Sequence, residues 1–330
     1  MVTIKVKVGS LGYEVRPSHI IESPGGIIKR DDSLEEPMLF AFMEENVSRL
    51  MRRNQIGTAT NYRAALGSFR RFRKGIDLPL SRVDHTLIED YQAYLKSAGI
   101  TLNSISFYMR IMRAVYNRAV SAGMVSDVRP FRSVFTGMEK TRKRALRIEE
   151  IRRIRALDLS ADSDLGFARD IFMFLFFCRG MSFVDAAFLK KSDIREGVID
   201  YSRRKTGQRL WVKIVEQIRD IMERYPAPDS PYQLPIIAAP GSDERRQYET
   251  ALHRINKSLK IVGEMAGSSI KLTTYVCRHS WATIARNKNV PLGVISDALG
   301  HESAVTTQIY LDSIDTVVVD WANDIVLSEL

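Results

Sequence analysis

Residues 272–312 read LTTYVCRHSWATIARNKNVPLGVISDALGHESAVTTQIYLD, and the rest of the chain is organised around this stretch. After Arg278, apolar residues recur at helical spacing, and a second helical pattern begins at Pro291. Gly300 is the residue type that ends helices, so it predicts the end of the second one. His301 is therefore expected just beyond a helix C-terminus.

Tyr310 follows on another short helical pattern and completes a set of three reactive groups. A guanidinium from Arg278, an imidazole from His301 and this phenol could together hold and attack a phosphate. The sequence therefore raises the hypothesis of phosphoryl chemistry, which requires a phosphate-bearing partner and further cations.

Composition narrows the classes of protein and partner. The chain has 330 residues, of which 45% are hydrophobic and 27% charged, as expected for a globular protein of about two domains rather than a disordered one. It contains 49 Lys and Arg against 39 Asp and Glu, a net charge of +10. This balance favours a polyanion as partner, and nucleic acid is the commonest one.

The sequence also indicates a cellular location. Its two cysteines, Cys178 and Cys277, cannot form a disulfide framework and lack metal-ligand spacing. Residues 1–10 alternate like a strand rather than forming the apolar core of a signal peptide. The longest apolar run, residues 171–178, is much shorter than the roughly 20 residues that span a bilayer. We therefore expect a cytoplasmic protein without membrane contact.

The first half of the chain is predicted to be an arm followed by a helical bundle. Residues 1–35 carry turn and loop signals and are interpreted as an N-terminal arm. Residues 36–135 form a bundle in which apolar residues recur at helical spacing over 38–53, 58–75, 87–98 and 102–122. The excess of Lys and Arg between residues 47 and 144 is larger than that of the whole chain, so this module is the predicted DNA-binding domain.

Basic and amide side chains accompany the apolar stripes of two of these helices. Such side chains can contact phosphates and base edges in a groove, although a solvated basic face is the alternative. The candidate DNA-binding residues are Arg63, Arg70, Arg71, Arg110, Arg113 and Asn117.

A polar connector at residues 136–147 links the bundle to the second domain. It has no apolar periodicity, and a run of four basic residues within it suits a linker crossing a DNA backbone, or an ordinary exposed hinge. These are Lys140, Arg142, Lys143 and Arg144.

Residues 148–330 are predicted to form a second, mainly helical domain with one small antiparallel sheet. Strand patterns at 198–201 and 210–214 flank RRKTG, which places Lys205 at the tip of a hairpin. Helical patterns cover 149–157, 165–177, 182–189, 215–225 and 248–266.

This domain offers five groups suited to phosphoryl transfer: Arg179, Lys205, Arg278, His301 and Tyr310. No cluster of Asp, Glu and His has metal-ligand spacing, and no Gly-rich loop follows a strand. Without a metal, fixed cations must neutralise the charge of the transition state, and a proton must reach the departing oxygen.

Four blocks in the second half carry a family resemblance. They are CRGMSFVDAAFLKKSDI at 178–194, RRKTGQ at 203–208, TTYVCRHSWAT at 273–283 and LGHESAVTTQIYLD at 299–312. With these blocks the chain resembles the tyrosine recombinase (phage integrase) family over residues 36–330, and more closely the integrases of Bacteroidetes mobile elements.

The resemblance implies an N-terminal helical, SAM-like core-binding bundle, a catalytic domain and a set of roles. Arg179 and Arg278 would clamp the scissile phosphate, and Lys205 would protonate the leaving 5′ oxygen. His301 would donate a hydrogen bond to a non-bridging oxygen. Tyr310 would attack and become linked to a 3′ phosphate, with no cofactor or metal required.

Two positions depart from the family's pattern. Tyr275 stands where a histidine or lysine is usual, and a phenol with a pKa near 10 is a poor base at neutral pH. The usual register would place the first arginine at Ser182 rather than Arg179. We expect the two positions to share one helix face, which would let Arg179 reach the same phosphate.

The resemblance also bears on assembly. Residues 316–330 have apolar residues at helical spacing, and in the family such a helix docks on a neighbouring protomer, which implies a tetramer on double-stranded DNA. Accessory DNA-bending proteins and a nucleoid location are further implications. Two other functions remain open: DNA relaxation of the type IB topoisomerase kind, and a non-catalytic DNA-binding regulator.

Overall fold

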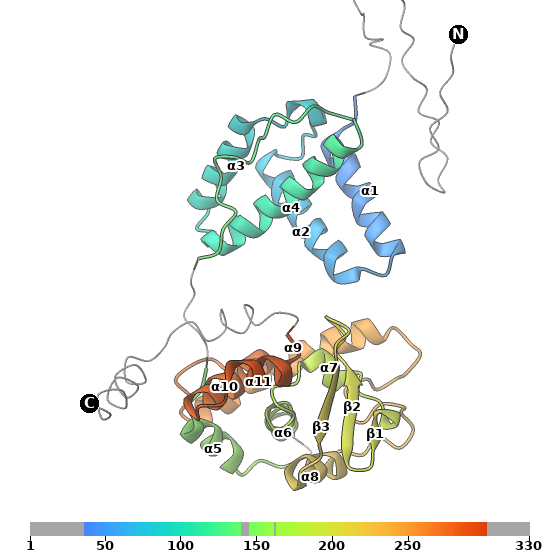
Figure 1. The fold of residues 1–330 in the computed structure, drawn as a ribbon, viewed down its shortest axis with the longest axis vertical. Coiled ribbons are helices and arrows are strands. Elements are labelled where there is room, and N and C mark those ends of the chain that lie inside the picture. Colours follow the sequence, from blue (N-terminus) through green and yellow to red (C-terminus); the bar gives the residue numbers. More distant parts are fainter. Residues whose placement is uncertain (1–35, 140–144, 162, 302–330) are drawn as a thin grey trace, which may run out of the picture. The chain divides into compact units, whose positions relative to one another are not determined.

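The computed structural model describes residues 36–139, 145–161 and 163–301, which fall in two compact units divided at residues 141 and 142 (Figure 1). Tyr310, the tail at 316–330, the arm at 1–35 and the linker residues Lys140, Arg142, Lys143 and Arg144 lie outside the described residues.

The first unit is a helical bundle. Its helices are α1 (Leu39–Arg52), α2 (Ile56–Phe72), α3 (His85–Ser97) and α4 (Leu102–Ser121), with a short 3₁₀ turn at Leu80–Arg82. The ring of Phe69 meets that of Tyr91 edge to face at 4.8 Å, and the Tyr91 hydroxyl donates to Ser68 Oγ at 2.8 Å. These contacts between α2 and α3 lie in the centre of the bundle, where both aromatic side chains are fully buried.

The second unit is built on a buried helix, α6 (Asp164–Phe177). Residues 171–177 explain this position, because a helical segment that is apolar on all sides is stable only in the protein interior. α8 (Glu216–Arg224), α9 (Glu244–Met265) and α10 (Thr274–Asn287) pack against it. Three further helices are α5 (Ile148–Ala156), α7 (Phe183–Ala187) and α11 (Leu292–Leu299), with a short 3₁₀ turn at Lys191–Asp193.

One antiparallel sheet accompanies these helices, in the order β1–β2–β3 (Figure 1). Its strands are β1 (Ile194–Arg195), β2 (Val198–Ser202) and β3 (Arg209–Lys213), with Tyr201 opposite Leu210. Alternate residues of β2 and β3 are buried, so one face of the sheet joins the core and the other is left for solvent.

The predicted fold class, mainly helical with a small antiparallel sheet, is confirmed. Two details differ from the prediction. β1 was not predicted because a two-residue strand carries no period. α10 begins at Thr274 rather than at Arg278, because the side chain of Asn256 on α9 accepts a hydrogen bond from the backbone N–H of Thr274 at 2.9 Å.

No helix within the described ranges is long and apolar enough to cross a membrane.

Candidate active site

Arg278 is the most firmly held residue of the predicted constellation. It lies on α10 with 4% of its surface exposed. Its Nη1 donates to the carbonyl oxygen of Gly180 at 2.9 Å, and its Nη2 donates to that of Leu299. The guanidinium is therefore fixed between the turn that follows α6 and the C-terminal end of α11.

The turn at Gly180 reaches Arg278 only because it has no side chain. Gly180 has a φ of +72°, and a Cβ atom there would lie 2.9 Å from Arg278 Cα. Both facts require glycine, since real Cβ atoms do not approach so closely and L-residues avoid this φ.

Gly300 ends α11 in the left-handed conformation, with a φ of +62°. The Gly300 N–H donates to the carbonyl oxygen of Asp297 at 3.0 Å, and the His301 N–H donates to that of Ser296 at 3.1 Å. This pair of bonds is a Schellman motif, and it places His301 directly after the helix, as predicted.

The His301 ring lies half-buried among positive charges. Its pKa falls to about 4, first because burial disfavours the charged imidazolium and then because Arg278, Arg203 and Lys205 repel it. His301 is therefore neutral at neutral pH, and a neutral imidazole carries one ring N–H donor and one ring nitrogen acceptor.

Arg203 is a member of this group that the sequence reasoning did not select. It is 6% exposed, its Nη1 donates to the carbonyl oxygen of Gly300, and its Nε lies 3.9 Å from Asp185 Oδ2. A signal was present in the sequence: Ile199, Tyr201 and Arg203 alternate along β2 and its extension, so Arg203 continues the inward face.

Lys205 lies exposed at the tip of the β2–β3 hairpin, and its positive charge contributes to the lowered pKa of His301. The hairpin is tied down by the buried carboxylate of Asp185. Its Oδ1 accepts from the Arg204 N–H at 2.9 Å, and its Oδ2 accepts from Ser182 Oγ at 2.6 Å. The tip that carries Lys205 is thus connected to the start of α7.

The expectation that Arg179 and Ser182 share a helix face is wrong. α6 ends at Phe177, Arg179 has a φ of +58°, and Ser182 is the N-cap of α7. Two consecutive left-handed residues, Arg179 and Gly180, form the turn between the helices. Arg179 is half-buried, and its charge acts on the Cys178 thiol.

Tyr275 projects from the first turn of α10 with 57% of its surface exposed. Its ring meets that of His279 edge to face at 4.6 Å. Since positions three and four apart share a helix face, Tyr275 lies on the same side of α10 as Arg278.

The two cysteines next to the arginines are not nucleophiles at neutral pH. Cys178 and Cys277 are both buried, and burial raises the pKa of the Cys277 thiol to about 12 and that of Cys178 further. Both sulfurs therefore stay protonated.

The six candidate DNA-binding residues of the bundle that the structure describes are all exposed: Arg63, Arg70, Arg71, Arg110, Arg113 and Asn117. Arg70 pairs with Glu44 at 2.6 Å. Arg113 donates weakly to Thr136 Oγ1 at 3.5 Å. The other side chains of the set are available to solvent in the same unit.

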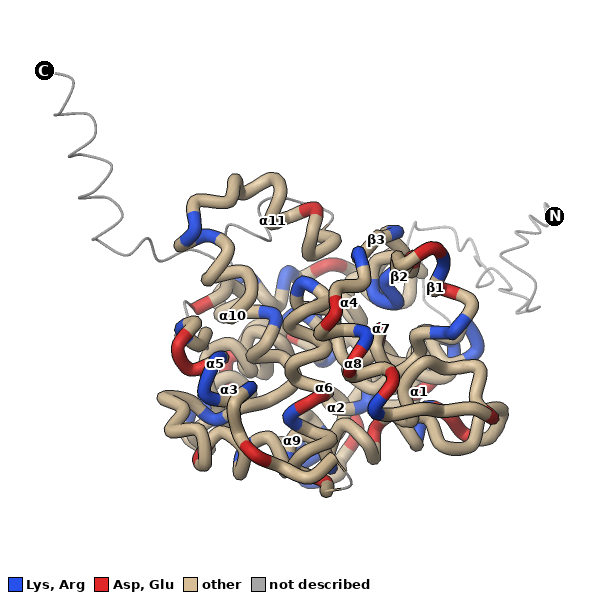
Figure 2. Tube along the Cα trace, turned by 90° about the horizontal axis from the view of Figure 1, so that it is seen from below, with Lys and Arg blue, Asp and Glu red and all other residues tan. Residues whose placement is uncertain are grey.

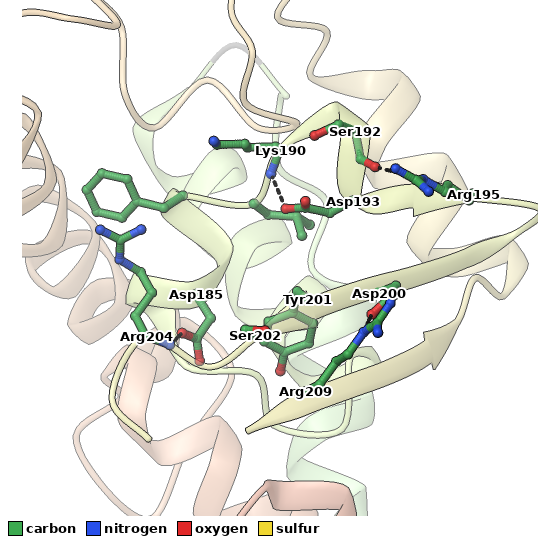
Figure 3. Close-up of a pocket in the computed structure, with 12 residues that line it drawn as sticks. Asp185, Lys190, Ser192, Asp193, Arg195, Asp200, Tyr201, Ser202, Arg204 and Arg209 are labelled. Atoms are coloured by element: carbon green, nitrogen blue, oxygen red, sulfur yellow. Dashed lines mark hydrogen bonds and ion pairs between the residues drawn. The ribbon is translucent and has the colours of Figure 1, made fainter. Parts of the chain in front are cut away.

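A cavity of about 460 Å³ lies beside the hairpin, but Arg203, Lys205, Arg278 and His301 do not line it (Figure 3). Its carboxylates serve the fold: Asp200 pairs with Arg209, and Asp193 accepts from the Lys190 N–H at 2.9 Å. Asp185 holds the hairpin as described above. Within the described part of the chain, no group of three His, Cys, Asp or Glu side chains could hold a metal ion.

Comparison with known proteins gives two family matches. The phage integrase SAM-like domain matches residues 38–133, and the phage integrase family matches residues 137–316, more than half of the chain. Tyrosine recombinase XerC of Halalkalibacterium halodurans is 24% identical over 300 residues, which cover 86% of this chain and 93% of that protein. Tyrosine recombinase XerA of Pyrococcus furiosus is 24% identical over 226 residues, 67% of this chain and 73% of that protein.

Solved structures share the fold. A lambda integrase tetramer bound to a Holliday junction is 16% identical with a TM-score of 0.64, covering 86% of this chain and 81% of that chain. The Tn1549 transposon integrase in complex with a circular intermediate DNA is 12% identical with a TM-score of 0.63, covering 87% and 98%.

Proposed function

Because the chain belongs to the phage integrase family and is a tyrosine recombinase, we propose that it cuts and rejoins DNA strands through Tyr310. One observation supports this assignment above the others. Arg278, Arg203, Lys205 and His301 converge at the C-terminal end of α11, and Tyr310 follows this end in the sequence.

In the proposed reaction, Tyr310 Oη gives up its proton and forms a bond to the scissile phosphorus while the bond from phosphorus to the 5′ oxygen breaks. One proton leaves the phenol for each proton that the 5′ oxygen gains. The product is a 3′-phosphotyrosine and a free 5′ hydroxyl. A 5′ hydroxyl from another strand reverses the step, so the energy of the phosphodiester is kept in the protein–DNA bond and no cofactor is consumed.

Each cationic or hydrogen-bonding side chain is assigned a role that follows from its position. Arg278 is held in place by two carbonyl oxygens, so its guanidinium charge is preorganised to stabilise the non-bridging oxygens. Neutral His301 donates a further hydrogen bond. Lys205, exposed on the hairpin tip, supplies the proton to the leaving 5′ oxygen.

We assign the second phosphate-clamping arginine to Arg203 rather than to Arg179. Arg203 is buried against Gly300, and its charge lowers the pKa of His301. Arg179 lies instead in the turn that follows α6. Tyr275 is assigned a contact to the phosphate, because its exposed phenol shares the helix face of Arg278.

Double-stranded DNA is the proposed partner of both units. Lys and Arg residues recur along the helices of each unit (Figure 2). The exposed basic residues of the bundle suit phosphate and base contacts. The lambda integrase relative forms a tetramer on a Holliday junction, which supports a tetramer joined by exchange of residues 316–330. Such a protein would work in the cytoplasm, at the nucleoid.

Recombination and simple relaxation can be separated on plasmid DNA. A plasmid carrying both ends of the encoding element should yield products with exchanged flanking sequences. Relaxed plasmid without exchange would identify a topoisomerase-like enzyme, and binding without any strand breakage would identify a regulator. The family match favours the first result.

A further inference from the structure

Two arginines from different helices converge on one buried amide in the first unit. Asn46 of α1 is 3% exposed. Its Oδ1 accepts from Arg118 Nη1 of α4 and from Arg49 Nη2 of α1, the latter at 3.3 Å. Its Nδ2 donates to the carbonyl oxygen of Phe42 at 2.8 Å, which fixes the direction of the amide.

No ion pair within the described residues of the first unit involves the Arg49–Arg118 cluster. In the described part of the unit, the ion pair present is Glu44–Arg70, and neither Arg49 nor Arg118 takes part in one. The pKa of Arg49 is lowered, first by burial and then by the charges of Arg118 and Arg53, which outweigh the opposite effect of Glu45. Both arginines are only partly buried, but two like charges held on one acceptor repel each other unless an anion joins them.

We propose that the Arg49–Arg118 cluster binds a phosphate of the DNA backbone. A guanidinium has five N–H donors, and Asn46 takes one from each arginine, so both retain donors for a phosphate oxygen. This assignment rests on the proposed action on DNA and adds the C-terminal ends of α1 and α4 to the DNA-binding residues predicted from the sequence.

A helix-capping role is the competing explanation. Arg49 and Arg118 both lie in the last turn of their helices, where a positive charge is favoured by the helix dipole. That role explains each arginine separately but gives no reason for both to share one neutral oxygen. The two explanations differ in what a built-in carboxylate would do.

The deciding variant is Asn46→Asp in the full-length protein. The new carboxylate would pair with both arginines, which offsets the lost donation to the carbonyl oxygen of Phe42. The melting temperature should therefore stay close to that of the wild type, while the carboxylate takes the place of the phosphate. The matched control is Asn54→Asp, which adds the same charge at an exposed left-handed position just beyond α1. Fluorescence anisotropy with a labelled duplex, titrated at several salt concentrations, measures the affinity and its salt dependence.

The proposal predicts that Asn46→Asp lowers the slope of log affinity against log salt by about one unit, as expected for one lost phosphate contact. Asn54→Asp should keep the wild-type slope. Arg118→Gln should lower the slope like Asn46→Asp, with circular dichroism to confirm that it folds.

Equal slopes for Asn46→Asp, Asn54→Asp and the wild type would overturn the proposal. A second experiment measures the melting temperature of the wild type with and without inorganic phosphate. If phosphate raised the melting temperature while all salt slopes stayed equal, the cluster would bind free anions and the assignment to DNA would be wrong. Neither result bears on the proposed function, because covalent attachment through Tyr310 at saturating protein is measured independently.

Discussion

Arg203 donates to the carbonyl oxygen of Gly300, in the same turn that positions His301 and next to the carbonyl of Leu299 that holds Arg278. Arg179 lies at a left-handed position between two helices. The two arginines therefore differ in side-chain contacts and in backbone position, although the sequence pattern favoured Arg179. The difference can be measured one substitution at a time.

Replacing Arg203 by Gln should slow covalent attachment to a nicked duplex by about a hundredfold or more, as for the loss of a preorganised donor to a transition-state oxygen. Arg179→Gln should slow it by less than about tenfold. Rates are measured at saturating protein, with thermal unfolding to confirm the folded state. A larger effect of Arg179→Gln than of Arg203→Gln would mean that Arg179 is the second phosphate-clamping arginine.

The depressed pKa of His301 predicts a pH dependence of stability. Between pH of about 6.5 and about 4, the unfolded chain binds a proton at His301 that the folded chain does not, so the free energy of unfolding falls as the pH drops through this window. The effect is modest because the ring is only half-buried. Denaturant unfolding at pH 7.5 and 4.5 should show a smaller decrease for His301→Gln, and equal decreases would contradict the assignment.

At the scale of elements, Gly300 connects α11 to the β2–β3 hairpin. A Cβ there would lie 2.6 Å from Arg203 Cδ and 3.1 Å from Leu210 Cδ1. The end of the helix and the hairpin therefore fit together only through a glycine, and this packing places His301 and Arg203 together.

Gly300→Ala tests this packing against Gly267→Ala. Both positions have positive φ, so each substitution costs about 1–2 kcal/mol in backbone strain, but Gly267 has open space around it. Gly300→Ala should therefore lower the free energy of unfolding further and should also slow covalent attachment. The packing argument would be contradicted if the two variants lost equal stability and Gly300→Ala attached to DNA at the wild-type rate, because Arg203 could then move without affecting the site.

Most elements could be predicted from the sequence because their periods are local. Gly300, the Lys205 hairpin and the buried helix α6 all follow from residue types within a few positions. The rest depends on distant contacts. The start of α10 is set by Asn256, and the turn after α6 requires Gly180 to meet Arg278, a residue nearly a hundred positions away.

The site was predictable to the same extent. Arg278 and His301 lie close together at the end of α11, and both are near it in the sequence as well. Arg203 was not selected because its partner, Gly300, is brought near only by folding. The sequence indicates which residue types suit phosphoryl chemistry, and the packing determines which arginine lies beside the imidazole.

For the whole molecule, the proposal predicts that assembly and chemistry are separable. Removing residues 316–330 should abolish complexes with more than two protomers on paired DNA sites, because exchange of this segment is the proposed link. Covalent attachment to a single nicked site should continue. Native gel electrophoresis and a denaturing gel measure the two properties on the same samples, and a tetramer formed without the segment would contradict the link.

The most direct test of the central claim is to identify the atom that becomes joined to DNA. A duplex nicked next to the crossover site traps the covalent product, and mass spectrometry of the digested adduct locates the attachment. The account predicts a 3′ phosphate on Tyr310, lost completely in Tyr310→Phe. A 5′ linkage, attachment to another residue, or an undiminished adduct in Tyr310→Phe would contradict it.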